Sequence, residues 1–209
     1  MPIPQRRTVV ANITLSLDGR VAGPAGEHDM GWIVPHAIGD GPREHMVQVT
    51  APATTALLGR KNYQGFAGFW PSVADDDSAD PRDRTFARWL NAVEKVVFST
   101  TLEEVEWDNA RLATEDPAAT VKRLRLEEGG DIIVLASTSV IRQLLDADEL
   151  DRLSITLCPE LVGGGARLFT DGPAATSWSL TATRVSDSGA ICLLYDRIRA
   201  ASLTPSGRS

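Results

Sequence analysis

The apolar run at residues 132–135, Ile-Ile-Val-Leu, constrains the fold more than any other segment of the chain. It lies between Asp131 and Ser137 and lacks the polar alternation of a half-exposed strand, so it predicts a strand buried on both faces of a sheet. The residues that follow predict a helix with one apolar face, formed by Val140, Ile141, Leu144 and Leu145. A buried strand followed by a sheet-covering helix indicates an α/β domain.

The rest of the chain continues the alternation of strands and helices. Residues 8–17 place Ile13, Leu15 and Leu17 in alternation with polar residues, which predicts the first strand. Further strands are expected at 56–58, 95–98 and 153–157, and helices at 43–50, 82–91 and 117–128. The last two strands, 178–185 and 190–198, flank a turn at 186–189 and predict a hairpin. We therefore expect a three-layer α/β domain with a mixed, mostly parallel sheet and a C-terminal antiparallel hairpin.

The length of 209 residues suits a single domain, expected at 8–198, with flexible tails at 1–7 and 199–209. Residues 22–42 are rich in glycine and proline and predict a long loop around Trp32. Long loops in compact domains are often functional lids. Residues 71–83 hold several aspartates without the spacing of metal ligands, which predicts a solvated loop.

Composition argues against several kinds of partner. The net charge of −7 and the isoelectric point near 5.0 disfavour binding to a nucleic-acid backbone. No stretch approaches the ~20 apolar residues needed to span a bilayer. No cleavage site of an export signal follows Arg6 and Arg7, so we expect a cytoplasmic protein. Cys158 and Cys192 fall in predicted strands and are expected to be buried thiols, and the histidines do not form a zinc site, so no metal is predicted.

Glycine, hydroxyl and charged residues recur where predicted strands end. The segments are 16–19 (Ser-Leu-Asp-Gly), 59–63 (Gly-Arg-Lys-Asn-Tyr), 95–102, 135–140 and the glycine triplet 163–165. Open α/β sheets bind ligands outside the carboxyl ends of their strands. In 59–63, glycine permits close approach, a helix start offers free N–H groups, and arginine offers a bidentate donor, which together suit a phosphate. Each segment alone also fits a structural explanation, such as a tight turn or a helix cap.

In this order the segments resemble the reductase domain of the riboflavin-biosynthesis deaminase-reductases, within the dihydrofolate-reductase-like family, over residues 8–198. The resemblance implies a stand-alone reductase that binds NADPH, because the His-x-Glu and Pro-Cys-x-x-Cys motifs of the deaminase half are absent from the sequence. Asn62 stands where the family usually has threonine, and Ala136 where it usually has glycine. The strand carboxylate that protonates dihydrofolate has no clear counterpart, which argues against a true dihydrofolate reductase.

The resemblance also implies roles for individual residues. Cofactor contacts are expected from Gly59, Arg60, Asn62, Ser99, Thr100, Ala136, Ser137, Thr138, Ser139 and Gly164. Asp18 is the catalytic candidate, and Asn12 and Trp32 are expected on the substrate side, with the loop 22–42 closing over the nicotinamide. A homodimer formed through sheet edges and the closing hairpin is implied as well.

The expected activity is hydride transfer from NADPH to a small heterocyclic substrate. Reduction of 5-amino-6-(5-phosphoribosylamino)uracil in riboflavin biosynthesis is the leading candidate reaction. Two alternatives stay open, a reductase of an unrelated small substrate and a nucleotide-binding protein without turnover. Asn62 and Ala136 differ from the residues usual in the family, which makes the second alternative conceivable.

Overall fold

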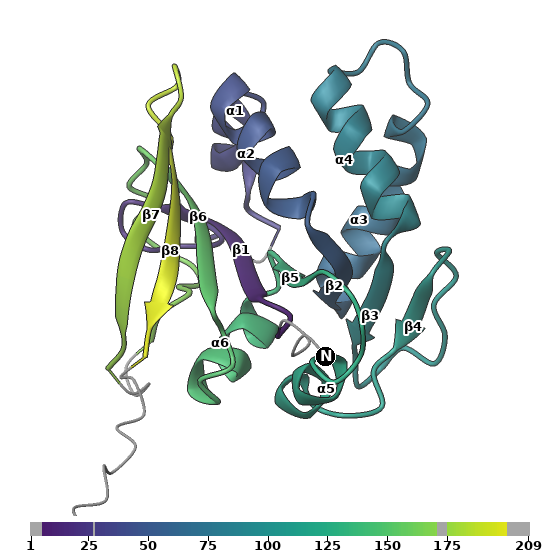
Figure 1. The fold of residues 1–209 in the computed structure, drawn as a ribbon. Helices are drawn as coiled ribbons and strands as arrows, with labels where there is room; N and C mark the ends of the chain where they lie inside the picture. Colours follow the sequence, from purple (N-terminus) through teal and green to yellow (C-terminus); the bar gives the residue numbers. More distant parts are fainter. Residues whose placement is uncertain (1–5, 27, 171–174, 200–209) are drawn as a thin grey trace, which may run out of the picture.

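The computed structural model describes residues 6–26, 28–170 and 175–199. Their strands form one eight-stranded sheet (Figure 1). The strands are β1 (Val9–Ser16), β2 (Ala53–Gly59), β3 (Glu94–Phe98), β4 (Ala110–Leu112), β5 (Asp131–Leu135), β6 (Arg152–Cys158), β7 (Ser177–Val185) and β8 (Ile191–Ile198). Their order across the sheet is β4-β3-β2-β5-β1-β6-β8-β7. The first six strands in this order, β4 through β6, all pair in parallel. The last two, β8 and β7, form a hairpin that pairs antiparallel to β6. The predicted sheet is therefore confirmed.

Helices cover both faces of the sheet and complete the predicted three layers. They are η1 (Gly31–Ile33), α1 (Val34–Ala37), α2 (Asp40–Thr50), α3 (Arg60–Val73), α4 (Pro81–Ala92), α5 (Pro117–Leu124) and α6 (Thr138–Asp146). One apolar cluster joins the sheet to α5 and α6, and a second joins the opposite face to α2, α3 and α4 (Figure 1). Among the described residues, no helix has the length and apolar character needed to cross a membrane.

The connections of β1 and β5 leave the sheet on opposite faces. The chain passes from β1 to β2 through α2, and from β5 to β6 through α6. These two strands are neighbours, so the sheet has a topological switch point at their carboxyl ends. A crevice opens at such a point because the two connections diverge, and ligands of open α/β sheets bind there. The fold thus places the segments that follow Ser16 and Leu135 at the expected ligand site.

Two expectations about local structure were wrong, and one strand was missed. The loop 22–42 contains η1, α1 and the start of α2. The helix expected at 117–128 ends at Leu124. The next residues form hydrogen bonds between residues three apart, as in a 3-10 turn, from Leu126 N–H to Arg123 O and from Glu127 N–H to Leu124 O. The short edge strand β4 was missed, since three half-buried residues show no alternation to detect.

Arg7 and Arg199, at the borders of the expected tails, make hydrogen bonds to the folded domain. Arg7 is only 5% exposed, and its guanidinium donates to Gly130 O at 2.7 Å and to Thr55 Oγ1 at 2.7 Å. At the other end, Arg199 donates to Asp151 Oδ1 at 2.7 Å. Residues 1–5 and 200–209, the remainder of the predicted tails, lie outside the described residues.

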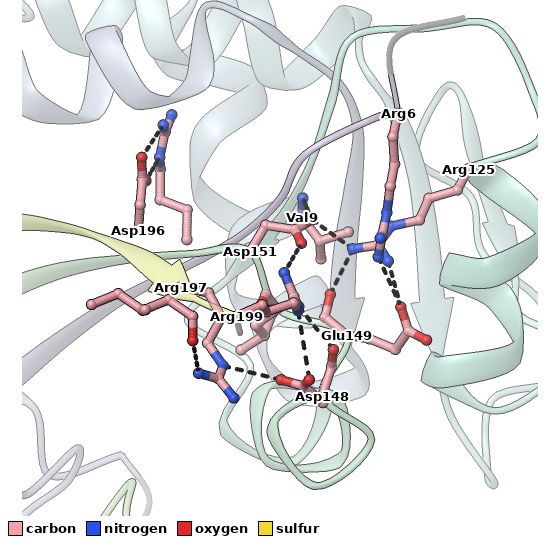
Figure 2. Close-up of polar contacts among 12 residues, drawn as sticks. Arg6, Val9, Arg125, Asp148, Glu149, Asp151, Asp196, Arg197 and Arg199 are labelled. Atoms are coloured by element: carbon pink, nitrogen blue, oxygen red, sulfur yellow. Dashed lines mark hydrogen bonds and ion pairs between the residues drawn. The ribbon is translucent and has the colours of Figure 1, made fainter. Parts of the chain in front are cut away.

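A network of ion pairs joins the amino ends of β1 and β6 to the end of α5 (Figure 2). The Arg125 side chain is 8% exposed and donates to Glu149 Oε2 at 2.6 Å and to Asp151 Oδ2 at 2.5 Å. Asp151 Oδ2 also accepts the N–H of Val9 at 2.9 Å. A single guanidinium therefore holds three segments that are distant in sequence.

We expect Arg125→Met to lower the free energy of unfolding by about 3–5 kcal/mol, because Glu149 and Asp151, whose side chains are 12% and 20% exposed, lose their most buried partner. Arg123→Met on the same helix is the matched control. Its side chain is 41% exposed and pairs with Glu115 and Glu127, so its loss costs about 1 kcal/mol or less. Urea unfolding of both variants measures the difference. Equal losses for the two would contradict a stabilising role for the Arg125 network.

Candidate active site at the carboxyl edge of the sheet

Two helices begin side by side at the carboxyl edge without side-chain caps. Gly59 precedes α3 and Ser137 precedes α6, and neither position carries a side-chain capping bond. By contrast, Asp80 caps α4 and Asp116 caps α5. The first N–H groups of α3 and α6 are thus left for another acceptor, and two helix starts together favour an anion such as a pyrophosphate.

The Ser137 hydroxyl joins these two helix starts. It donates to Leu135 O at 2.8 Å and accepts the N–H of Gly59 at 2.8 Å, and Ser137 is only 2% exposed. Because its single proton is used within the fold, this hydroxyl has none to give a phosphate. What the turn offers a cofactor is the backbone N–H groups of Thr138 and Ser139.

Ala136 adopts the backbone conformation that explains why glycine suits this turn. Its φ is +48°, in the left-handed region that alanine rarely occupies. Its N–H donates to Asn12 O at 2.9 Å, so the strained residue is fixed to β1. Alanine in place of the usual glycine at position 136 therefore keeps the left-handed turn, at a cost in backbone strain.

The other predicted cofactor residues lie along the same edge. Phe98 lies opposite Gly59 in the pairing of β3 with β2, so Ser99 and Thr100 follow beside the start of α3. The Ser99 hydroxyl oxygen accepts the N–H of Leu102 at 2.9 Å, while Thr100 is exposed. Arg60 is half-buried, and its guanidinium donates a long hydrogen bond of 3.3 Å to Gln64 Oε1. Asn62 is half-buried in the first turn of α3.

Asp18 fastens the glycine segment to the end of β1. Its carboxylate accepts the N–H groups of Val162 at 3.1 Å and Gly163 at 3.0 Å. It also accepts the Ser16 hydroxyl at 2.7 Å and the Arg20 Nε–H at 3.3 Å. The Ser16 hydrogen bond is the first cause that lowers the pKa of Asp18 well below its usual range, followed by the backbone donors and Arg20. At neutral pH the group is a carboxylate with no proton to donate.

A polar floor lies beneath α2, where β1 and β6 run side by side. Asn12 lies opposite Ser154, and Asn12 Nδ2 donates to Ser154 Oγ at 2.9 Å. His45 reaches down from α2, with its Nε2 2.7 Å from the same hydroxyl. Asn12 is 6% exposed and Ser154 0%, so the predicted substrate-side residue Asn12 belongs to a buried polar group of three.

Further polar residues continue this floor toward the carboxyl edge. Thr14 lies opposite Thr156, and Ser16 opposite Cys158. The sequence analysis missed His45, Ser154 and Thr156. The usable signal was that β1 and β6 both carry small polar residues at alternate positions, which a central parallel strand has no solvent-facing side to accommodate.

The segment after β1 brings Trp32 and His36 toward the end of β6. His36 is 6% exposed, and its Nε2 lies 2.9 Å from Glu160 Oε1. Trp32 is half-buried, and its indole N–H is buried without a hydrogen-bond partner among the described residues. These positions border the carboxyl edge. Lid closure over a nicotinamide stays a prediction.

Both cysteines are free and buried, as expected, and burial raises the pKa of the Cys158 thiol to about 11. Within the described ranges, no group of three or more His, Cys, Asp or Glu side chains is placed to hold a metal ion.

Sequence comparisons place this chain among known proteins. Residues 7–192 match the family model of the RibD C-terminal domain. The Bacillus subtilis (strain 168) protein named uncharacterized protein YyaP is 24% identical over 191 residues, which cover 91% of this chain and 95% of that protein.

Structure comparisons agree with the fold. A putative riboflavin biosynthesis protein from Shewanella sp. PV-4 has a TM-score of 0.68 at 22% identity, covering 92% of this chain and 99% of that chain. A Thermotoga maritima deaminase/5-amino-6-(5-phosphoribosylamino)uracil reductase has a TM-score of 0.62 at 15% identity, covering 92% and 57%. A dihydrofolate reductase from Enterococcus faecalis, complexed with NADP(H), has a TM-score of 0.56 at 14% identity, covering 93% and 99%. The fold is dihydrofolate-reductase-like.

We expect Ala136→Gly to raise the free energy of unfolding by up to about 1 kcal/mol. Removing a left-handed penalty of roughly 1–2 kcal/mol outweighs the roughly 0.5–1 kcal/mol of extra chain entropy that glycine loses on folding. Ala136→Val should be destabilising, because β-branching makes the left-handed region still less accessible. Chemical denaturation of the three proteins tests this order. A lower stability for the glycine variant would contradict strain at position 136.

Proposed function

Because the chain belongs to the RibD C-terminal domain family, we propose that it is an NADPH-dependent reductase that transfers hydride to a small heterocyclic substrate. The observation that carries this proposal is the pair of uncapped helix starts at Gly59 and Ser137, next to the switch point of the sheet. The NADP(H) complex of the structurally similar dihydrofolate reductase supports the choice of cofactor.

The residues at this edge fit a dinucleotide phosphate. The free N–H groups at the starts of α3 and α6 would hold the pyrophosphate. Arg60, whose hydrogen bond to Gln64 is long, would bind the 2′-phosphate together with the hydroxyls of Ser99 and Thr100. Gly59 keeps the backbone open to close approach, since a side chain there would point at Ser137 and Ser139.

The substrate would lie between the nicotinamide and the polar floor under α2. The bound cofactor supplies the hydride, and the chain supplies alignment and hydrogen bonds. Asn12 and His45, both held by the Ser154 hydroxyl, would orient a heterocycle that has both donors and acceptors. Asp18 takes a positioning role in this proposal, because its carboxylate holds the glycine segment and stays ionised.

The leading substrate is 5-amino-6-(5-phosphoribosylamino)uracil, the compound in the name of the Thermotoga maritima protein. An unrelated small heterocycle is the first alternative. A nucleotide-binding protein without turnover is the second, and the strained Ala136 at the cofactor turn is the observation that favours it. NADPH titration followed by substrate-dependent NADPH oxidation separates the three: NADPH binding without oxidation by the pyrimidine would exclude the leading substrate, and NADPH binding without oxidation by any of a panel of small heterocycles would favour the last.

We expect Arg60→Ala to weaken NADPH binding by about 1.5–3 kcal/mol and NADH binding much less, because only NADPH carries the 2′-phosphate that a guanidinium binds by charge-assisted hydrogen bonds. Arg88→Ala, at an exposed position on α4, is the control for a general change of charge. Fluorescence titration with both nucleotides gives the affinities. Equal losses for NADH and NADPH would show that Arg60 does not read the 2′-phosphate.

We further propose that the protein is a homodimer formed through β7. This edge strand is exposed or half-exposed along all nine residues, including Leu180 at 50% and Val185 at 70%. A long edge with apolar side chains invites pairing with another strand. Light scattering at micromolar concentration should give twice the chain mass of 22.5 kDa.

Leu180→Lys should shift this protein toward the monomer, because it places a charge on the proposed interface. Leu126→Lys is the control, since Leu126 is 88% exposed but lies just after α5. A monomeric wild-type protein, or equal effects of the two variants, would overturn the proposed interface.

A further inference from the structure

A groove of about 160 Å³ lies beside the polar floor, between α2 and the strands β6, β8 and β7. His45, Gln48 and Val49 line it from the helix, and Val10 and Leu194 line it from the sheet. None of the lining residues belongs to the carboxyl edge that we assign to the cofactor. The groove is therefore a separate compartment, with His45 as the wall that it shares with the polar floor.

One end of the groove carries a weakly matched positive charge. Arg184 on β7 lies on the rim, with Nη1 3.7 Å from Glu44 Oε2 and Nη2 3.5 Å from Gln48 Oε1, both at the outer limit of a polar contact. Its side chain is 40% exposed. A guanidinium held this loosely can turn several N–H groups toward a ligand.

The other charges of the groove are matched or distant. Arg152 uses Nε and Nη2 on the two carboxylate oxygens of Asp196, at 2.6 and 3.2 Å. Asp131 lies on β5, four strands from β7, which is about 19 Å across the sheet at the usual strand spacing. Burial raises the pKa of Asp131 and also that of the Cys192 thiol. The Arg184 end is thus the positive end.

The opposite wall of the groove is apolar, and the volume of the groove suits a small ring. Val10 and Leu194 from the sheet and Val49 from α2 belong to one apolar cluster. Cavities of roughly 150 Å³ accept a benzene molecule. We infer that this groove binds a small amphiphilic anion, a single ring that carries a carboxylate, with the ring on the apolar wall and the carboxylate at Arg184.

His45 provides a reporter inside the site. Its pKa is lowered by burial first and by the positive charge of Arg184 second, so it responds to charge at that end of the groove. A carboxylate bound at Arg184 offsets that positive charge and raises the pKa of His45. Through Ser154 the imidazole also contacts Asn12, which links the groove to the proposed substrate floor.

Benzoate is the probe, and benzamide, which has the same ring without the charge, is its matched control. We expect benzoate to shift the His45 ring signals saturably in proton NMR and to raise the His45 pKa, while benzamide does neither. His45→Gln identifies these signals among the three histidines. Arg184→Met should weaken benzoate binding at least about ten-fold, the loss of one charge-assisted contact, and Arg184→Lys should retain part of the affinity.

Three results would overturn the site: no saturable shift with benzoate, equal binding of benzamide, or unchanged benzoate binding in Arg184→Met. A parallel NADPH titration of the same variants keeps this inference apart from the proposed reductase function. Loss of benzoate binding with intact NADPH binding supports the groove, because it shows that Arg184→Met is folded. NADPH binding without any benzoate site refutes the groove and leaves the cofactor proposal standing.

Discussion

The carboxyl edge depends on one buried hydroxyl, that of Ser137. The pairing between β2 and β5 ends at Leu57 and Val134, before the ends of the two strands. Ser137 links the strand ends beyond that point by donating to Leu135 O and accepting the N–H of Gly59. Without that bridge, the starts of α3 and α6 would have no direct link. Their N–H groups converge because a side chain that the sequence suggested as a phosphate donor serves the fold instead.

The polar floor is the second constraint, because buried polar groups are costly unless they are hydrogen-bonded. On the same face of the sheet, the middles of β2, β3 and β5 contribute apolar side chains such as Leu58, Val97 and Ile133. On β1 and β6 the face changes to Asn12, Ser154 and their neighbours, which satisfy one another and His45. An apolar floor would pack under α2 at lower cost. A polar one makes physical sense where a ligand needs hydrogen bonds, which is why we assign the substrate to it.

Sequence patterns sufficed for most of the fold, because the apolar runs and glycine breaks of the strands are local. They failed where a residue's role depends on a distant partner. Lys95, part of a segment read as a ligand-binding strand end, is fully buried at its start and donates from Nζ to Leu90 O and Val93 O, which closes the end of α4. Likewise, the alternation in β1 predicted a strand, but its central place between β5 and β6 and the helices on both of its faces depend on residues far away in the sequence.

The glycine triplet shows how the two explanations offered by the sequence combine. A side chain at Gly164 would approach Pro24 Cβ to 2.9 Å, and one at Gly165 would collide with the carbonyl oxygen of Ala22. The segment after β6 therefore lies directly on the segment after β1, and Asp18 fastens it there through Gly163 N–H. The glycines thus serve packing first. By packing there, they lie at the carboxyl edge of the sheet, where ligands of open α/β sheets bind, so a structural role and an expected ligand position come from the same backbone contact.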